Sequence, residues 1–278
     1  MQQLSLGFSP CPNDTFIFYA LVHGKVELPG LQIKERLEDV ETLNRLALAG
    51  TLDLTKISYH AFGHLRRDYV LLRSGGALGR GCGPLVVARN PLSMEELRGK
   101  SLAIPGRLTT ANLLLQLYAE DFGQVVEMPF HKIMAAVASG RVDAGVIIHE
   151  SRFTYQEHGL VPVVDLGYWW EEETGHPIPL GGILARRSLG SERIRNIDRA
   201  LRASVEYALQ YPQQTRAYIR QHAQELSEQV IDDHIQLYVN DFSVDVGTAG
   251  IQAIEILFAR AEQRGILPRC DLPLFIDS

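Results

Sequence analysis

His149 is the side chain best placed for proton chemistry. It follows residues 144–148, an apolar run short enough to be a strand buried on both faces, and the polarity changes abruptly at His149 and Glu150. Ligands of open α/β sheets bind outside the carboxyl ends of strands, and imidazole has the side-chain pKa nearest neutrality. We therefore predict that His149 is catalytic and transfers protons. The alternative is a histidine that only forms a hydrogen bond at a strand end.

An internal repeat points to a second strand end. Residues 50–59 align without gaps on residues 140–149, and in both copies a helical pattern leads to a glycine, an aspartate and an apolar strand. The glycine suits the left-handed position after a helix, where a side chain costs energy. Further upstream, a strand, loop and helix at residues 4–22 resemble the segment that starts at residue 101. Two similar α/β units explain this pattern, and the alternative is a chance match, because helix–glycine–strand joins are common.

The repeat places Ser58 and Tyr59 at the strand end that corresponds to His149. Lys56, Ile57 and Ser58 are therefore expected to face His149 across a cleft. Ser58 offers a hydroxyl and backbone amides to a ligand, and Lys56 offers a positive charge. The alternative is that Ser58 and Tyr59 only close a strand.

A helix that starts at Thr109 or Thr110 is the candidate site for an anion. The first turn of a helix presents unpaired amides and a partial positive charge, which suit a carboxylate or phosphate. A threonine at this place also caps its own helix, whether or not a ligand binds. Asn13 and Asp14 begin the corresponding helix of the first unit and allow the same two interpretations. We include Asn13 among the expected substrate contacts.

The sequence contains no recognisable cofactor-binding or metal-binding motif. The glycine-rich residues 75–83 match neither the P-loop nor the dinucleotide-binding pattern. No second histidine follows His149 at zinc-protease spacing, and no G-x-S-x-G elbow occurs. Cys11 lies between two prolines, and nothing in the sequence pairs it with a base. We expect no metal and no cofactor.

Composition limits the classes of partner. The 278 residues are 46% hydrophobic, and 33 acidic residues against 27 basic ones give a net charge of −6. Nucleic-acid-binding proteins usually carry a basic excess or a basic stripe, so that class is excluded. Three scattered cysteines indicate a reducing compartment. Neither a signal-peptide pattern nor an apolar run of about 18 residues is found, so we expect a cytoplasmic protein without a membrane segment.

The order of elements predicts an α/β protein with two lobes and mainly parallel sheets. Strands at 84–88 and 181–185 are expected to cross between the lobes. Lobe 1 then comprises residues 1–87 and 182–278, with the C-terminal helices, and lobe 2 comprises residues 88–181. The C-terminal helices are expected to pack on lobe 1 and to contribute no chemistry. Apolar residues at helical spacing and helix start signals predict helices at 13–22, 40–49, 133–139, 192–210 and 248–264.

Four motifs together carry a family resemblance over essentially the whole chain. They are Ser9-Pro-Cys-Pro-Asn-Asp-Thr-Phe16, Gly106-Arg-Leu-Thr-Thr-Ala111, Gly145-Val-Ile-Ile-His-Glu150 and Pro177-Ile-Pro-Leu-Gly181. In this order they resemble the 1,4-dihydroxy-6-naphthoate synthase family, which acts in the futalosine route to menaquinone. The first motif is distinctive, whereas the strand–loop motifs are shared with many two-lobed binding proteins.

The resemblance implies a type II periplasmic-binding-protein fold with a ligand cleft between two α/β lobes. It implies a lyase that converts cyclic dehypoxanthinyl futalosine to 1,4-dihydroxy-6-naphthoate, with His149 as the base. The substrate contacts of the family correspond here to Lys56, Ile57, Ser58, Thr109 and Thr110. The expected partner is a small molecule with a carboxylate, and the protein is expected to be a monomer or a homodimer. The alternatives are a chorismate dehydratase of the same pathway and a non-catalytic small-anion binding protein.

Overall fold

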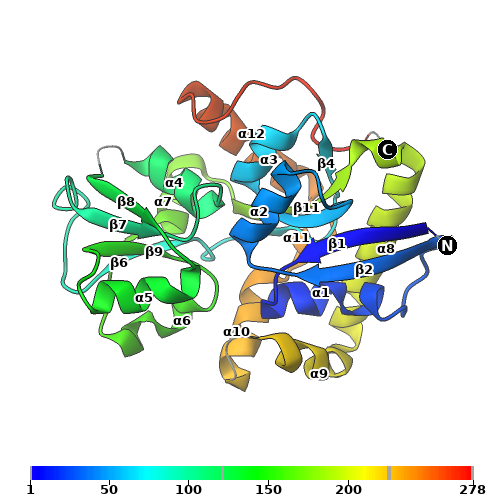
Figure 1. Ribbon diagram of the computed structural model, residues 1–278, viewed down its shortest axis with the longest axis horizontal. Helices are drawn as coiled ribbons and strands as arrows, with labels where there is room; N and C mark the ends of the chain where they lie inside the picture. The colour runs from blue at the N-terminus through cyan, green and yellow to red at the C-terminus, as the bar shows by residue number, and fades with distance from the viewer. Residues whose placement is uncertain (1, 120–121, 224–226, 277–278) are drawn as a thin grey trace.

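The chain folds into two α/β lobes, each built on one sheet (Figure 1). The computed structural model describes residues 2–119, 122–223 and 227–276. The sheet of lobe 1 has the order β2 (Leu31–Leu37), β1 (Gln2–Phe8), β3 (Leu54–Ser58), β11 (Ile178–Arg186) and β4 (Tyr69–Leu71), with β5 (Ala77–Gly79) also paired to β11. The sheet of lobe 2 has the order β10 (Val161–Asp165), β6 (Leu85–Ala88), β9 (Ala144–Ile147), β7 (Ser101–Ile104) and β8 (Gln124–Glu127).

The two sheets repeat one topology. In lobe 1, β2, β1 and β3 are parallel neighbours and β11 pairs antiparallel to β3. In lobe 2, β8, β7 and β9 are parallel neighbours and β6 pairs antiparallel to β9. Parallel pairing is therefore found among three strands of each sheet, but the prediction of mainly parallel sheets is wrong, because the remaining pairings, which involve β4, β5, β6, β10 and β11, are antiparallel. Strands β6 and β11 run the other way because each comes from the opposite lobe and enters its sheet at the cleft edge.

A serine–aspartate pair links two neighbouring parallel strands in the same way in both lobes, which confirms the internal repeat. Ser5 donates from its amide and its hydroxyl to Oδ2 of Asp53, both at 2.8 Å. Ser101 donates in the same way to Oδ2 of Asp143, at 2.9 and 2.7 Å. The glycine before each aspartate has a positive φ, 61° at Gly50 and 73° at Gly140 in the two copies. A chance sequence match would not produce matching hydrogen bonds.

The two crossing strands define where the chain changes lobe. The predicted boundaries at 87/88 and 181/182 fall inside β6 and β11, yet each of these strands belongs wholly to one sheet. We propose that the chain leaves lobe 1 just before Leu85 and returns just before Ile178. Strand β11 begins at Ile178, three residues before the crossing strand predicted at 181–185.

The predicted helices are found, with ends that differ by at most a few residues. Helix α1 begins one residue early because Pro12 occupies its first turn, where a missing N–H costs nothing. The helices before β11 are α1 (Pro12–Val22), α2 (Val40–Leu48), α3 (Tyr59–Leu65), α4 (Thr110–Tyr118), α5 (Phe130–Ala138), α6 (Ser151–Thr154), η1 (Tyr155–His158) and α7 (Leu166–Thr174). The helices after β11 are η2 (Arg187–Leu189), α8 (Ser191–Gln210), α9 (Pro212–His222), α10 (Glu228–Tyr238), α11 (Asp241–Val244) and α12 (Gly247–Gln263).

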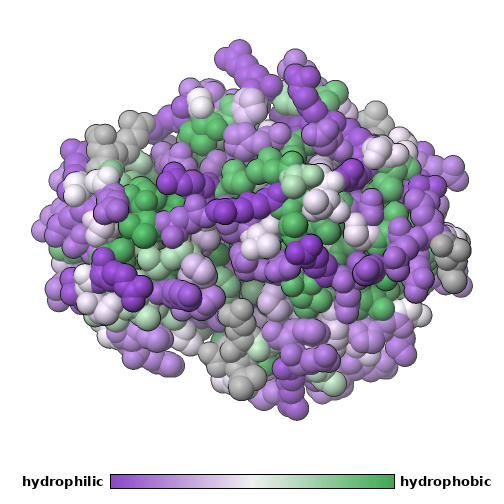
Figure 2. Space-filling view, viewed as in Figure 1, coloured by the Kyte–Doolittle hydropathy of each residue, from purple (hydrophilic) through white to green (hydrophobic). Residues whose placement is uncertain are grey.

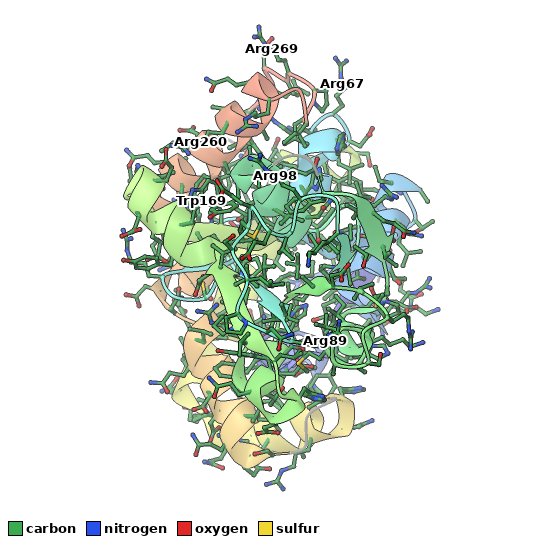
Figure 3. All side chains as sticks on the ribbon, turned by 90° about the vertical axis from the view of Figure 1, so that its left-hand side faces the viewer. Arg67, Arg89, Arg98, Trp169, Arg260 and Arg269 are labelled. Carbon is green, nitrogen blue, oxygen red and sulfur yellow. The ribbon has the colours of Figure 1, made fainter. Side chains whose placement is uncertain are left out.

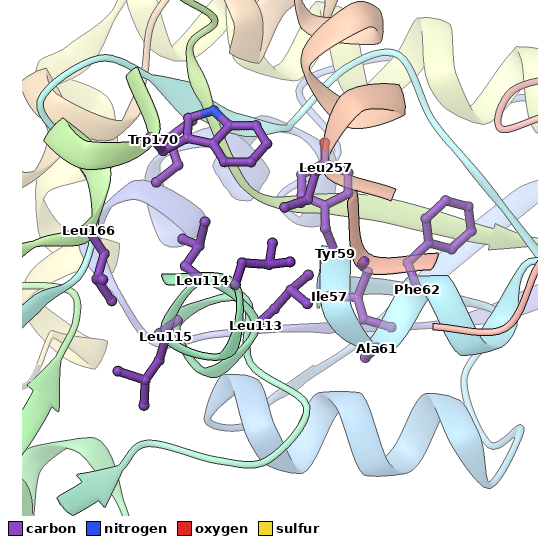
Figure 4. Close-up of a cluster of buried hydrophobic side chains, with 14 of the residues drawn as sticks. Ile57, Tyr59, Ala61, Phe62, Leu113, Leu114, Leu115, Leu166, Trp170 and Leu257 are labelled. Atoms are coloured by element: carbon purple, nitrogen blue, oxygen red, sulfur yellow. The ribbon is translucent and has the colours of Figure 1, made fainter. Parts of the chain in front are cut away.

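One apolar core joins the lobes behind the cleft. Leu113 and Leu114 of α4 belong to the same buried cluster as Tyr59 of α3, Leu257 of α12 and Trp170 of α7 (Figure 4). Trp170 is fully buried and donates from Nε1 to the carbonyl of Pro177 at 3.1 Å. Trp170 is therefore a core residue and does not line the cleft. Because α4 is held by this core, the start of α4 keeps a fixed position relative to β3.

Among the described residues, most charged side chains lie on the outer surface, and the buried exceptions are Asp14, Glu41 and Lys56. The face in Figure 2 shows hydrophilic residues around small, separate hydrophobic areas. Arg67 and Arg269 project outward from one end of the molecule (Figure 3). None of the helices in the described ranges is long and apolar enough to cross a membrane.

Candidate active site

A cleft between the lobes lies at the carboxyl ends of β3 and β9, where α1 and α4 begin. It is lined by residues of both lobes, and a cleft between two lobes is a common place for a small-molecule ligand. All of the residues predicted for the site line this cleft, namely Asn13, Lys56, Ile57, Ser58, Thr109, Thr110 and His149. The structure brings them together, and the role of each stays a prediction.

His149 stands at the turn that follows β9, and its backbone is strained there. Apart from glycines, it is the one described residue with a positive φ, at 57°. Such a backbone conformation costs about 1–3 kcal/mol, and residues that adopt it are frequent at functional sites. The side chain is partly exposed to the cleft and packs against the ring of Phe130, with 5.0 Å between centroids. Burial lowers the pKa of His149 to about 4, against the opposing charge of Asp14. The imidazole is therefore neutral at pH 7 and able to accept a proton.

Cys11 contacts His149 across the cleft. Its Sγ lies 3.6 Å from Nδ1 of His149, a pairing that the sequence does not reveal. The two residues are 138 positions apart and belong to different lobes, so no local motif links them. Burial raises the pKa of the Cys11 thiol, which therefore stays protonated rather than becoming a nucleophile. Because Nδ1 of His149 faces Cys11, Nε2 is the nitrogen left for a substrate.

Asp14 organises the loop between β1 and α1. Its carboxylate accepts hydrogen bonds from the amide and hydroxyl of Ser9 at 3.1 and 2.7 Å, and from Nδ2 of Asn13 at 2.9 Å. It also pairs with Nζ of Lys56 at 2.7 Å. This network explains the Ser9 to Asp14 part of the first motif. Because Asp14 neutralises Lys56, Lys56 supplies less positive field to the cleft than its charge alone suggests.

Helix α10 contributes two residues to the site, so the prediction that the C-terminal helices carry no chemistry needs correction. Tyr238 lines the cleft. His234 lies behind it, fully buried, with Nε2 2.9 Å from Oδ1 of Asn13. The His234 ring lies parallel to that of His149, with 6.2 Å between centroids. No local pattern marks His234, because a histidine in an amphipathic helix is usually a surface or packing residue.

The hydroxyl groups of Thr109 and Thr110 form hydrogen bonds with other groups of the protein. Thr109 caps α4, accepting from the amide of Asn112 at 3.2 Å. Thr110 joins the lobes, because its Oγ1 accepts from the amide of Tyr59 at 2.9 Å and donates to the carbonyl of Leu180 at 2.5 Å. The capping interpretation is thus confirmed for Thr109. Any contact of Thr110 with an anion would come from its amide.

Three donors remain available at one corner of the cleft. In the described part of the chain, no acceptor contacts the amides of Thr110 and Ala111, the first two of α4. Ser58 accepts a hydrogen bond from Nδ2 of Asn44 at 3.2 Å, which leaves its own hydroxyl hydrogen for another partner. Because the bond from the Tyr59 amide to Thr110 ties β3 to α4, these donors lie close together. They form a site suited to a carboxylate.

The sequence matches a protein-family model described as menaquinone biosynthesis over residues 4–263. The chain belongs to this family. A 1,4-dihydroxy-6-naphthoate synthase of Thermus thermophilus is 60% identical over 276 residues, covering 99% of this chain and 100% of that protein. A 1,4-dihydroxy-6-naphthoate synthase of Streptomyces coelicolor is 48% identical over 271 residues, covering 95% of both chains. The resemblance inferred from the four motifs is therefore confirmed.

Solved structures confirm the fold of this menaquinone biosynthesis family member. A protein from Archaeoglobus fulgidus superposes with a TM-score of 0.90 at 40% identity, over 95% of this chain and 98% of that one. The CA3427 protein of Candida albicans, described as having the generic periplasmic binding protein fold, superposes with a TM-score of 0.71 at 14% identity, over 98% and 92% of the two chains. At 14% identity, the similarity to the Candida albicans protein supports the fold and nothing about function.

Proposed function

We propose that this protein is a 1,4-dihydroxy-6-naphthoate synthase, a carbon–carbon lyase acting on cyclic dehypoxanthinyl futalosine. The observation that carries the proposal is one cleft holding a neutral imidazole, His149, together with three free donors, the Ser58 hydroxyl and the Thr110 and Ala111 amides. Two relatives that carry this name, at 60% and 48% identity, support it.

The Ser58 hydroxyl and the amides of Thr110 and Ala111 bind the substrate carboxylate. The Ser58 hydroxyl comes from lobe 1, and the amides of Thr110 and Ala111 come from lobe 2. Apolar side chains contact the fused ring along the walls of the cleft, among them Val40, Ala77, Pro84, Ile148 and Leu180. Anchoring the carboxylate fixes the ring relative to His149, which lowers the entropic part of the barrier.

His149 starts the reaction by removing a hydroxyl proton from the sugar-derived part of the substrate. As this oxygen forms a carbonyl, the adjacent carbon–carbon bond breaks and its electron pair moves into the ring system. The ring becomes the aromatic naphthoate, and the sugar-derived fragment leaves as a carbonyl compound. The step is a retro-aldol cleavage without a net change of oxidation state, so the proposal includes no cofactor. A positioned base of this kind contributes about 10²–10⁴-fold in rate.

The surroundings of His149 suit a base that is charged only briefly. Burial keeps the ring neutral in the resting enzyme by lowering its pKa, and the charge of Asp14 raises this pKa while that of its ion-pair partner Lys56 lowers it. The contact between Nδ1 and Cys11 holds the ring plane. For Nε2 to accept the proton, Nδ1 carries the hydrogen and directs it toward the sulfur of Cys11.

Incubation of the purified protein with each candidate substrate tests the proposal. We expect cyclic dehypoxanthinyl futalosine to disappear and 1,4-dihydroxy-6-naphthoate to accumulate, as measured by liquid chromatography with mass detection. Conversion of chorismate instead would replace the proposal by a chorismate dehydratase. Tight binding of either compound without product would identify a small-anion binding protein.

A further inference from the structure

Cys11, His149 and Glu150 form a cluster of metal-binding side chains beside the cleft. One potential ligand atom of each residue lies within 4.8 Å of the others. Cys11 precedes α1 in lobe 1, whereas His149 and Glu150 follow β9 in lobe 2. The fold therefore creates this cluster from distant segments, which is why no metal motif appears in the sequence.

The contact between Cys11 and His149 has the spacing of two ligands on one zinc ion. A tetrahedral ion with sulfur at about 2.3 Å and nitrogen at about 2.0–2.1 Å holds these two atoms about 3.6 Å apart. The observed separation of Sγ and Nδ1 is 3.6 Å. An ion can therefore bind both atoms with little movement of either side chain.

His234 is an independent observation that points to the same place. It is fully buried, and its Nε2 is occupied by Asn13. Its Nδ1 has no hydrogen-bond partner within the described ranges and lies 4.0 Å from Oε2 of Glu150. An unsatisfied buried nitrogen costs about 1–3 kcal/mol. A water molecule on a metal ion at the cluster would satisfy it by donating to Nδ1.

We propose that Cys11, His149 and Glu150 bind one thiophilic divalent cation such as Zn²⁺, and that the bound ion blocks catalysis. Thiolate, imidazole and carboxylate are each ligands of zinc, and three protein ligands leave the fourth position open to water. An ion on Nδ1 of His149 leaves the ring hydrogen on Nε2, so the imidazole has no lone pair for the substrate proton. The inhibition rests on the proposed function, whereas binding of the ion does not.

Cobalt spectroscopy tests the binding directly. Protein treated with a chelator and then desalted is titrated with Co²⁺ under argon, and absorption is recorded. A tetrahedral site with one thiolate gives visible ligand-field bands and a sulfur-to-cobalt charge-transfer band in the near ultraviolet. We expect these bands to saturate at one ion per chain and to vanish when Zn²⁺ displaces Co²⁺. Absence of the charge-transfer band, or weak octahedral bands alone, would overturn the proposal.

Three variants assign the ligands. Cys11→Ser should abolish the charge-transfer band, and Glu150→Gln, which keeps the side-chain shape, should keep the band but weaken Zn²⁺ binding. Because loss of an outer-shell partner alone costs about 10–100-fold in metal affinity, loss of the direct ligand Cys11 should cost at least about 100-fold. Cys270→Ser is the matched control, since Cys270 lies outside the cleft, and it should behave as wild type. A band that survives in Cys11→Ser would contradict the assignment.

An activity assay tests the inhibition separately. Zn²⁺ should abolish naphthoate formation in the wild type and in Cys270→Ser, and a chelator should restore it. In Cys11→Ser, the Zn²⁺ concentration for half inhibition, relative to that variant's own activity, should rise at least about 100-fold in step with the lost affinity. Full activity with the ion bound would overturn the inhibitory part. Failure of the proposed function would appear differently, as no naphthoate from metal-free protein, and would leave the cobalt spectra unchanged.

Discussion

Nζ of Lys56 lies 2.7 Å from Oδ1 of Asp14, and both side chains are buried beneath the cleft. Lys56 belongs to β3 and Asp14 to the first turn of α1. The pair therefore ties the central strand of lobe 1 to the loop that carries Cys11. Lys56 therefore stabilises the structure around the site and also lines the cleft.

Lys56→Met should destabilise the protein by about 3–5 kcal/mol, because it leaves the Asp14 carboxylate buried without its partner. Lys56→Met combined with Asp14→Asn should recover part of this loss, since no charge is then left uncompensated. Urea unfolding followed by circular dichroism measures both values. Lys34→Met, at an exposed lysine of β2, is the control and should change stability by less than about 0.5 kcal/mol. Equal losses for Lys56→Met and Lys34→Met would contradict the framework role.

Ser101→Ala should destabilise lobe 2 in a pH-dependent way. Hydrogen bonds from Ser101 lower the pKa of Asp143, so the stabilisation is present above the unfolded pKa and is lost as the pH falls through the folded pKa. We expect a cost of about 1 kcal/mol at pH 7, as measured by thermal unfolding across this range. The cost should shrink in strong acid but not vanish, because Oγ of Ser101 also accepts from the amide of Asp143 at 3.0 Å, a bond that does not depend on the carboxylate charge. Ser139→Ala removes a hydroxyl that donates to a carbonyl instead, and its cost should not change with pH. A cost of Ser101→Ala that stays constant down to the lowest pH would refute this explanation.

Thr110→Val should weaken both the fold and substrate binding. The change removes the hydroxyl that bridges Tyr59 and Leu180, and loss of such buried bonds costs about 1–3 kcal/mol. Because the bridge fixes the start of α4, we also expect a higher KM. Thr110→Ser retains the hydroxyl and should restore both values, as measured by urea unfolding and steady-state kinetics. An unchanged stability in Thr110→Val would show that the bridge is not formed in solution.

Ser58→Ala should raise KM about 10- to 150-fold with little change in kcat. One hydrogen bond to an anion accounts for about 1.5–3 kcal/mol, and this bond is made equally in the ground and transition states. Initial rates with the natural substrate give this value. The matched control is the substrate methyl ester, in which the carboxylate charge is absent, and on which wild type and Ser58→Ala should act alike. If the variant lost the same factor with the ester, Ser58 would not contact the carboxylate.

Site residues at the ends of single strands could be predicted from the sequence, whereas contacts between the two lobes could not. His149 is recognisable because polarity changes where a buried strand ends, and the repeat then leads to Ser58. The partner of His149 is not recognisable, because Cys11 reaches it only when the two lobes approach. His234 is invisible for a similar reason, since only the packing of α10 on α1 brings it to Asn13. Local patterns thus located the site, and tertiary packing determined its hydrogen bonds.

The antiparallel strands β6 and β11 show a second limit. Their apolar runs predicted two crossing strands, but strand direction follows from the edge at which the chain enters each sheet. That edge is a property of the two-lobed topology and leaves no mark on the residues themselves. The Ser5–Asp53 and Ser101–Asp143 pairs, in contrast, lie within the repeat and can be read once the repeat is known.

The turnover of His149→Asn with cyclic dehypoxanthinyl futalosine tests the central claim most directly. Single-turnover rates of naphthoate formation are compared with those of wild type and of His158→Asn, a variant at an exposed histidine outside the cleft. We predict that His149→Asn is slower by at least about 10²-fold, with an unchanged circular dichroism spectrum, and that His158→Asn matches wild type. Near-normal turnover by folded His149→Asn would contradict the assignment of His149 as the general base.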